Sequence, residues 1–207
     1  MSESTKQFYI SNKNESIPMF ESRFMEFFSH VHPAVPVILY MPPIVYMLYR
    51  AFVYQKMSIL IVVVFFVFGV LIWTLLEYVV HRYVFHYEPK SRAGKTLHFI
   101  IHGVHHDYPN DASRLVLPPV ISLPLATLFY FLLAISFRGF APPIWAGLIS
   151  GYLCYDMIHY ATHHFAMKNR VGRWLKQHHL RHHYKDDDAG YGVSSPLWDH
   201  IFGTARK

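Results

Sequence analysis

Histidine is the residue type with the greatest chemical potential in this chain, because most of its sixteen copies fall in four clusters. The clusters read HRYVFH at 81–86, HFIIHGVHH at 98–106, HYATHH at 159–164 and HHLRHH at 178–183. A neutral imidazole is a good ligand for iron, copper, nickel or zinc. One ion takes about four to six ligands, so this many imidazoles predict two bound metal ions.

The spacing within the clusters favours shared ligation, since residues three or four apart lie on one face of a helix. Three sets can each direct their rings at one point: His102, His105 and His106; His159 and His163; His179, His182 and His183. The five-residue spacing of His81 and His86 does not stack on a regular helix. It fits either a helix end where the chain unwinds or ligands to two different metals. His98 and His178 also stand at helical spacing from cluster members, so spacing alone does not exclude them.

Other metal and histidine chemistries are less consistent with the sequence. The HExxH motif of zinc peptidases is missing, and the single cysteine, Cys154, rules out a structural Cys/His zinc site and an intrachain disulfide. A solvated or pH-sensing histidine tract is the plain alternative. Four clusters, three of them at helical spacing, favour metal ligands over it. We interpret the isolated His30, His32 and His200 as ordinary polar side chains.

The elements that must position these histidines are predicted to be membrane helices. The chain is 53% hydrophobic and only 15% charged, and a helix of about 20 apolar residues crosses a bilayer. Four stretches meet that length: 35–54, which Pro42 and Pro43 should kink, then 58–80, 115–137 and 141–160. Residues 20–28 predict a short amphipathic helix at the lipid headgroups, with a plain surface helix as the alternative. We therefore expect an all-α integral membrane protein, with an interfacial segment over 1–34 and a membrane-embedded domain over 35–207.

The distribution of basic residues predicts the topology. Sixteen of the nineteen Lys and Arg residues lie in the N-terminal arm, the 81–114 loop and the C-terminal tail. Only Arg50, Lys56 and Arg138 lie in the two short loops between the spans. By the positive-inside rule, both termini and all four histidine clusters face the cytoplasm, at the endoplasmic reticulum or a bacterial inner membrane. The net charge of +6 then reflects membrane topology rather than nucleic-acid binding, and the N-terminus lacks the pattern of a cleaved signal peptide.

Two acidic residues stand inside the predicted spans, where a carboxylate is costly and usually functional. Glu77 precedes His81 by four residues, and Asp156 precedes His159 by three. Metal-bound imidazoles usually donate their second N–H to a carboxylate or carbonyl. We predict that both acids accept hydrogen bonds from ligand histidines; ordinary hydrogen bonding between helices is the alternative. The acids at 186–188 are expected in a solvated loop.

Five segments together resemble the fatty acid hydroxylase/sterol desaturase superfamily, and most closely its fatty acid 2-hydroxylase branch. They are WTLLEYVVHRYVFH (73–86), TLHFIIHGVHHDYPND (96–111), RLVLPP (114–119), GYLCYDMIHYATHH (151–164) and HLRHHYKDDDAGYGVSSPLWDHIFGT (179–204). The resemblance covers about residues 73 to 204. It implies four transmembrane helices with a cytosolic helical cap that carries a histidine-rich dimetal site.

The resemblance also assigns the ligands. They are His81, His86, His102, His105, His106, His159, His163, His179, His182 and His183. Leaving out His98, His164 and His178 rests on the resemblance, and at His178 the family more often has an aromatic residue. Tyr155 matches a family position beside the metals, so Tyr155 and Asp156, with Glu77, are the predicted catalytic support.

The implied activity is O2-dependent hydroxylation at C2 of a long-chain fatty acid or sphingolipid N-acyl chain, on two irons that zinc can replace in purified protein. The acyl substrate would come from the bilayer. The haem loop of a fused cytochrome b5, His-Pro-Gly-Gly, has no match beyond His32-Pro33-Ala34, so we expect a separate cytochrome b5-like or ferredoxin donor. The alternatives are a related sterol, long-chain-base or carotenoid oxygenase, or a metal transporter or sensor, whose ligands should lie near the bilayer midplane.

Overall fold

The computed structural model describes residues 9–205, and within this range the chain folds entirely into helices, turns and loops, without a β-strand. Three basic residues used to predict the topology, Lys6, Arg206 and Lys207, lie outside the described residues. The α-helices are α1 (Arg23–Ser29), α2 (Ala34–Tyr49), α3 (Ile59–Val80), α4 (Arg92–His98), α5 (Val104–Asp107), α6 (Pro119–Phe137), α7 (Ala141–His164), α8 (Arg170–Tyr184) and α9 (Leu197–Ile201). Tighter or wider turns extend them: the π-helices η1 (Arg50–Tyr54), η2 (His81–Phe85) and η3 (Phe99–Gly103), and the 3-10 helix η4 (Arg138–Phe140).

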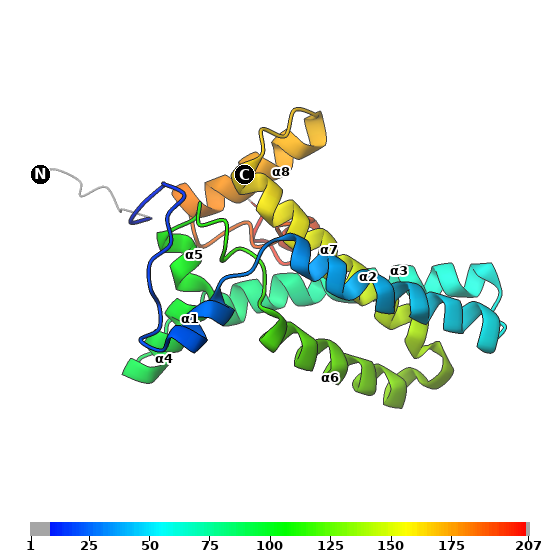
Figure 1. Cartoon of the computed structure of the whole chain (residues 1–207). Helices are drawn as coiled ribbons and strands as arrows, with labels where there is room; N and C mark the ends of the chain where they lie inside the picture. The colour runs from blue at the N-terminus through cyan, green and yellow to red at the C-terminus, as the bar shows by residue number, and fades with distance from the viewer. Residues whose placement is uncertain (1–8, 206–207) are drawn as a thin grey trace, which may run out of the picture.

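Three segments of the described chain are long and apolar enough to cross a membrane: Ala34–Tyr54, Ile59–Phe85 and Pro119–His164. The third contains two helices, α6 and α7, which η4 joins and which run in opposite directions (Figure 1). The four predicted stretches overlap these segments, although 58–80 begins one residue before the second segment and 115–137 begins four residues before the third. The prediction of an all-helical protein with membrane-length helices is confirmed. Helix α2 continues through Pro42 and Pro43.

Helix α7 is the centre of the bundle and packs against α2, α3 and α6. Its contact with α3 is close because glycines stand where the backbones meet. A Cβ atom on Gly69 would lie 2.0 Å from the carbonyl oxygen of Ile144, and one on Gly147 would lie 1.9 Å from that of Phe66. Small residues permit such backbone approach between membrane helices. The packing fixes the ends of α3 and α7, which carry histidines, relative to each other.

The surface of the bundle is apolar. Side chains such as Ile59 on α3 and Ile135 on α6 are 72% and 78% exposed. An apolar surface of this extent is typical of contact with lipid rather than water. Burial inside the bundle is concentrated on α7, where Ile144, Leu148 and Ile149 belong to the hydrophobic core.

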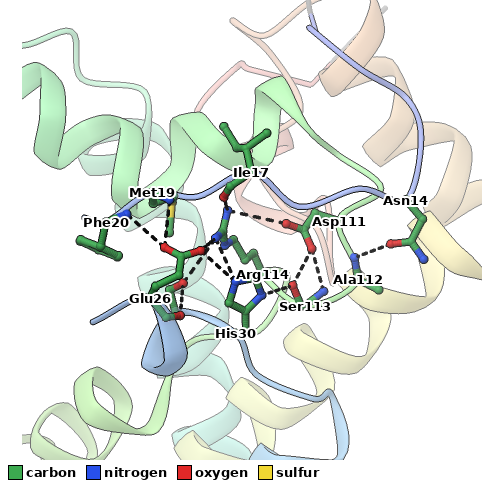
Figure 2. A network of polar contacts seen from close by, with 11 residues as sticks. Asn14, Ile17, Met19, Phe20, Glu26, His30, Asp111, Ala112, Ser113 and Arg114 are labelled. Atoms are coloured by element: carbon green, nitrogen blue, oxygen red, sulfur yellow. Dashed lines mark hydrogen bonds and ion pairs between the residues drawn. The ribbon is translucent and has the colours of Figure 1, made fainter. Parts of the chain in front are cut away.

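The N-terminal arm is tied to the loop that leads from α5 into α6. Figure 2 shows the buried Arg114 side chain donating hydrogen bonds to the carbonyl oxygen of Ile17 and to the carboxylate of Glu26. The backbone N–H groups of Met19 and Phe20 donate to the same carboxylate, at 2.9 and 3.0 Å. The arm is therefore fastened to the segment that follows the second histidine cluster, 98–106.

Candidate metal centre

The ten predicted ligand histidines gather in two groups, each offering five ring nitrogens that lie within 4.8 Å of one another. Cluster I consists of His81, His86, His102, His106 and His182. Cluster II consists of His105, His159, His163, His179 and His183. Segments far apart in the sequence therefore meet, as the spacing and the resemblance predict.

Cluster I depends on two π-helical turns. In η2 the backbone N–H of His86 donates to the carbonyl oxygen of His81 at 3.2 Å, five residues earlier. A π-turn brings residues five apart onto one face, and such turns are frequent at functional sites. Both rings therefore belong to one cluster, and the alternative of ligands to two metals is wrong for this pair. His102 lies in the second π-turn, η3.

Cluster II is built on regular helices. His159 and His163 lie one turn apart on α7, and His179 and His183 lie one turn apart on α8. His105 from α5 completes the group. All five residues are buried, whereas His86 and His106 of cluster I are only partly buried.

The structure divides two of the histidine sets that we expected to share one focus. On α8, His179 and His183 join cluster II, whereas His182 joins cluster I. At about 100° per residue, a step of four residues turns the side chain about 40° one way and a step of three about 60° the other way. The same division separates His105 from its neighbours His102 and His106. As a result α5 and α8 serve both clusters, and the rings of His106 and His183 stack across the boundary at 4.3 Å.

The nitrogen positions fit bound metal ions. In cluster II the Nε2 atom of His105 lies 2.8 Å from that of His159 and 3.0 Å from that of His183. In cluster I the Nε2 atoms of His86 and His182 are 3.0 Å apart. Two imidazole nitrogens bound to one ion at about 2.0–2.1 Å, with an angle of about 90–110°, lie about 2.9–3.4 Å apart. The spacing of these nitrogens is therefore that of neighbouring ligands on one cation.

The protonation of the rings also suits metal binding. Burial lowers the pKa of His106 to about 3, and the nearby His86 adds to the decrease. Burial likewise places the pKa values of His102 in η3 and His105 in α5 well below the ordinary value of 6.5, and does the same for His179, His182 and His183 on α8. Neutral rings at neutral pH keep the lone pair that a metal ligand needs.

Two cluster I rings are oriented by backbone carbonyl groups. The Nδ1 atom of His81 donates to the carbonyl oxygen of Tyr191 at 2.6 Å, and Nδ1 of His182 donates to that of Ala189 at 3.0 Å. Each donation fixes the tautomer whose Nε2 lone pair faces the cluster. The segment around Ala189–Tyr191 is therefore part of the metal-binding framework.

Glu77 supports this segment rather than a histidine ring, which corrects the predicted direct hydrogen bond to a ligand. Its carboxylate accepts from the backbone N–H groups of Val193 and Ser194, both at 2.7 Å, and from the Ser194 hydroxyl. The physical reason is that the C-terminal segment passes over the end of α3 and presents unpaired N–H groups there. Glu77 holds residues 193–194 in place, and Tyr191, shortly before them in the chain, accepts the hydrogen bond from the His81 ring. Glu77 therefore orients His81 indirectly.

Asp199 is a supporting residue that sequence reasoning missed. It is completely buried, and its carboxylate accepts from the backbone N–H groups of Tyr191 and Gly192, at 2.9 and 2.8 Å. A Cβ atom on Gly192 would lie 2.0 Å from the carbonyl oxygen of Ser195 and 3.0 Å from Asp199 Oδ2, so the close packing here needs glycine. The available signal was an acid in the otherwise apolar stretch PLWDHIF (196–202).

Tyr155 and Asp156 lie beside cluster II on α7. The Tyr155 ring stacks on His159 with a centroid distance of 5.6 Å, and it also approaches Trp73 at 5.8 Å. Asp156 is 1% exposed, and its polar neighbour is the hydroxyl of Tyr152, one turn earlier on α7. The predicted hydrogen bond from a ligand ring to Asp156 is not formed, since the carboxylate lies one turn below His159 along α7.

The remaining histidines lie outside both clusters. His98 donates from Nε2 to the carbonyl oxygen of Phe85 at 2.6 Å. The ring of His164 stacks on Tyr160, and that of His178 stacks on Trp174. Helical spacing alone would also admit His98 and His178 as ligands, but their rings make these other contacts instead.

Comparison with known proteins gives a consistent match. The family model for fatty acid hydroxylases matches residues 66–204. Dihydroceramide fatty acyl 2-hydroxylase FAH2 from Arabidopsis thaliana is 39% identical over 191 residues, covering 89% of this chain and 78% of the relative. Its paralogue FAH1 is 43% identical with the same coverage. Fatty acid 2-hydroxylase from Rattus norvegicus is 44% identical over 67% of this chain and 38% of the relative.

A solved structure shares the fold. The structure of full-length scs7p, in which only the hydroxylase domain is visible, superposes with a TM-score of 0.83 at 36% sequence identity. The match covers 89% of this chain and 70% of that chain. The helical bundle with its histidine clusters is thus similar to a hydroxylase domain.

Proposed function

The chain belongs to the fatty acid hydroxylase family, and from that premise we propose that it is an oxidoreductase that hydroxylates C2 of a fatty acyl chain. The substrate is a long-chain fatty acid or the N-acyl chain of a sphingolipid, as the names of the relatives suggest. The observation that carries the proposal is the pair of five-histidine clusters at the ends of apolar helices. General acid–base groups alone do not break an unactivated C–H bond.

Each cluster holds one metal ion in this proposal, through the Nε2 atoms that already lie at ligand spacing. Iron is the catalytic metal, and the chemistry it supplies when bound is the activation of O2 for attack on the C–H bond. Zinc would occupy the same rings in purified protein, because it binds imidazole well and is redox-inert. The neutral histidines, the Tyr191 and Ala189 carbonyl groups and the Glu77–Asp199 framework keep the nitrogens directed at the two ions.

The helices cross the membrane four times, with α6 and α7 as separate spans. Both termini and the histidine clusters then face the cytoplasm, as the distribution of Lys and Arg supports. In this topology the predicted segment 1–34 is interfacial and the predicted domain 35–207 is membrane-embedded, of which residues 1–8 and 206–207 lie outside the described chain. The exposed aromatic residues of α1, Phe24 and Phe27 (73% and 74% exposed), support this interfacial placement.

The acyl chain reaches the clusters from the bilayer side, where Tyr155 and Asp156 lie. Tyr155 packs on the ligand His159 and has an apolar ring to offer the hydrocarbon. The Asp156 carboxylate, with the Tyr152 hydroxyl as its neighbour, supplies a buried polar group on this side of cluster II. We assign both residues to positioning the acyl group next to cluster II. Electrons come from a separate cytochrome b5-like or ferredoxin donor.

Lipid mass spectrometry of cells that produce the protein tests this function. The intact protein, with a working electron donor, should raise the level of 2-hydroxyacyl lipids. The His105→Ala/His106→Ala double variant removes one ligand from each cluster and should leave the lipids at the background level. No rise with the intact protein would refute the substrate assignment, and an equal rise with the variant would refute the metal role.

A further inference from the structure

Helix α8 has two opposite faces with different chemistry. Gly172 and the three cluster histidines are buried on the inner face. Arg170, Arg173, Trp174, Gln177 and Arg181 are all exposed. At about 100° per residue, these exposed positions fall within about 100° of arc centred opposite His179. We call these five residues the outer stripe of α8.

The outer stripe is basic and contains one aromatic residue, Trp174, at its edge nearest Val171. Trp174 is 44% exposed, and neighbouring Val171 is 67% exposed. Together with Arg170, Arg173 and Gln177 they line a shallow surface groove. Within residues 9–205, no ion pair or side-chain hydrogen bond engages Arg170, Arg173 or Arg181. Their charges are therefore free to act on a partner.

A chain of contacts leads from the outer stripe to cluster I. The Trp174 ring stacks on His178 with a centroid distance of 5.2 Å and an interplanar angle of 16°. The Nε2 atom of His178 lies 4.0 Å from Asp199 Oδ2. Asp199 in turn binds the backbone of Tyr191, whose carbonyl group orients His81. His178 also directly precedes the cluster II residue His179 in the sequence.

We propose that the outer stripe of α8 is the docking surface for an acidic one-electron carrier protein, with Trp174 as its aromatic contact. The inference rests on the proposed hydroxylase function. Conversion of R–H and O2 into R–OH and H2O consumes two electrons and two protons; one oxygen atom enters the alcohol and the other leaves as water. Two reduced carriers, each oxidised by one electron, supply the electrons.

The position of the stripe suits this role. A carrier bound over Trp174 is separated from both clusters by one helix, whose diameter with side chains is about 10–12 Å. Free arginines around an exposed tryptophan are the composition of an interaction hot spot. Transient electron-transfer complexes use small interfaces, which four turns of one helix can provide.

The charge of the stripe favours a protein over a lipid surface. The residues of α1 that we assign to lipid contact are Phe24, Phe27 and Phe28, which are aromatic and uncharged. The outer stripe instead places three arginines around a single tryptophan. Complementary charge steers a protein partner and gives an association rate that falls with salt.

The first experiment measures binding of a soluble, acidic cytochrome b5 to the zinc-loaded protein in neutral-lipid nanodiscs, so that catalysis is not involved. Arg170→Glu/Arg173→Glu should weaken binding at low salt by about tenfold or more, and binding should lose most of its salt dependence. Trp174→Ala should weaken it by about thirtyfold, whereas Trp174→Phe keeps most of the affinity. The matched control, Lys90→Glu/Arg92→Glu, makes the same charge change at two exposed basic residues at the start of α4 and should change binding less than about twofold.

A second arm separates docking from catalysis. With iron-loaded protein, a small-molecule reductant and mediator should drive hydroxylation equally in the wild type and in the Arg170→Glu/Arg173→Glu variant. With the cytochrome as reductant, the variant should be slower by about tenfold or more. Failure of the wild type with the small reductant would refute the proposed hydroxylation, while the binding result would still decide the docking.

Three results would overturn the docking proposal. One is unchanged cytochrome binding in both Arg170→Glu/Arg173→Glu and a second variant, Gln177→Glu/Arg181→Glu. Another is an equal loss in the Lys90→Glu/Arg92→Glu control, which would indicate unspecific charge attraction. The third is strong quenching of Trp174 fluorescence by brominated lipids, because such quenching would place the stripe in the membrane. The Trp174 signal is the fluorescence of the wild type minus that of Trp174→Phe.

Discussion

Cluster I and cluster II each contain five histidine side chains, but different structural elements hold them. Cluster II combines the regular helices α7 and α8 with His105, and all of its residues are buried. Cluster I includes residues from two π-turns, and His86 and His106 are only partly buried. Its His81 and His182 rings are oriented by the C-terminal segment that Glu77 and Asp199 hold.

The comparison indicates that packing orients three rings of cluster II, whereas backbone hydrogen bonds orient two rings of cluster I. The Nδ1 atoms of His163, His179 and His183 have no partner within the described chain, so the surrounding helices fix these rings. Changes to the C-terminal segment should therefore affect cluster I alone, and changes to a ligand should affect its own cluster.

The largest effect is expected from removing one ligand of either cluster. His102→Ala in cluster I and His163→Ala in cluster II should each lower the metal content from two ions per chain to one. Each should also reduce hydroxylation by more than about 100-fold, which exceeds the effect of losing an outer partner of a ligand. Elemental analysis and product quantification measure both. His164→Ala, next to a ligand but outside both clusters, should keep two metals and most of the activity.

An intermediate effect is expected from Asp199→Asn. The amide can no longer accept both backbone hydrogen bonds, so the Tyr191 carbonyl shifts and the His81 ring loses its orientation. Metal affinity of cluster I should fall by about 10–100-fold, while cluster II keeps its ion. Competition titration with a chelator should show one weakened site, and the exposed Asp188→Asn serves as the control. Equal weakening of both sites would contradict the difference between the frameworks.

Chelator access should distinguish the clusters without any mutation. Because His86 and His106 are partly exposed and cluster II is buried throughout, an excess of a chromogenic chelator should remove metal in two phases of one equivalent each. The fast phase belongs to cluster I, so it should be missing in His102→Ala. A single phase, or a fast phase that disappears in His163→Ala instead, would reverse the assignment.

The smallest effect is expected at the N-terminal arm. Arg114→Gln removes the cation between Glu26 and the Ile17 carbonyl group, and the loss of charged hydrogen bonds costs about 1–3 kcal/mol of unfolding free energy. Thermal unfolding should shift down by a few degrees while both metals stay bound. Burial would raise the pKa of Glu26, but hydrogen bonds from His30, Met19 and Phe20 and the charge of Arg114 lower it below 4.5. The ionised Glu26 carboxylate therefore stabilises the folded state fully above pH 4.5. As the pH falls below 4.5 and Glu26 becomes protonated, the difference in unfolding free energy between the wild type and Arg114→Gln should shrink.

Much of the site is predictable from the sequence, because histidines four residues apart stay on one helix face whatever the surroundings. His159 with His163 and His179 with His183 illustrate this. His105 and His182 each belong to a different cluster from their neighbours in the sequence. This assignment is not predictable, because it depends on how α5 and α8 lie between the two clusters. The common focus of His81 and His86 needed a π-turn, which no local residue pattern marked.

The supporting residues are harder to predict than the ligands. Glu77 and Asp156 were identifiable as acids inside apolar spans, but their partners depend on where the C-terminal segment returns. The 189–194 segment lies more than a hundred residues from α3 in the sequence, and its carbonyl groups carry no side-chain signal. Asp199 became recognisable only when its contacts with Tyr191 and Gly192 were seen.

The most direct test of the two-cluster centre is metal-edge anomalous diffraction from the purified, metal-loaded protein. We expect two anomalous peaks per chain, one surrounded by the Nε2 atoms of His81, His86, His102, His106 and His182 and the other by those of His105, His159, His163, His179 and His183. A single peak, or peaks located away from these ten rings, would contradict the account.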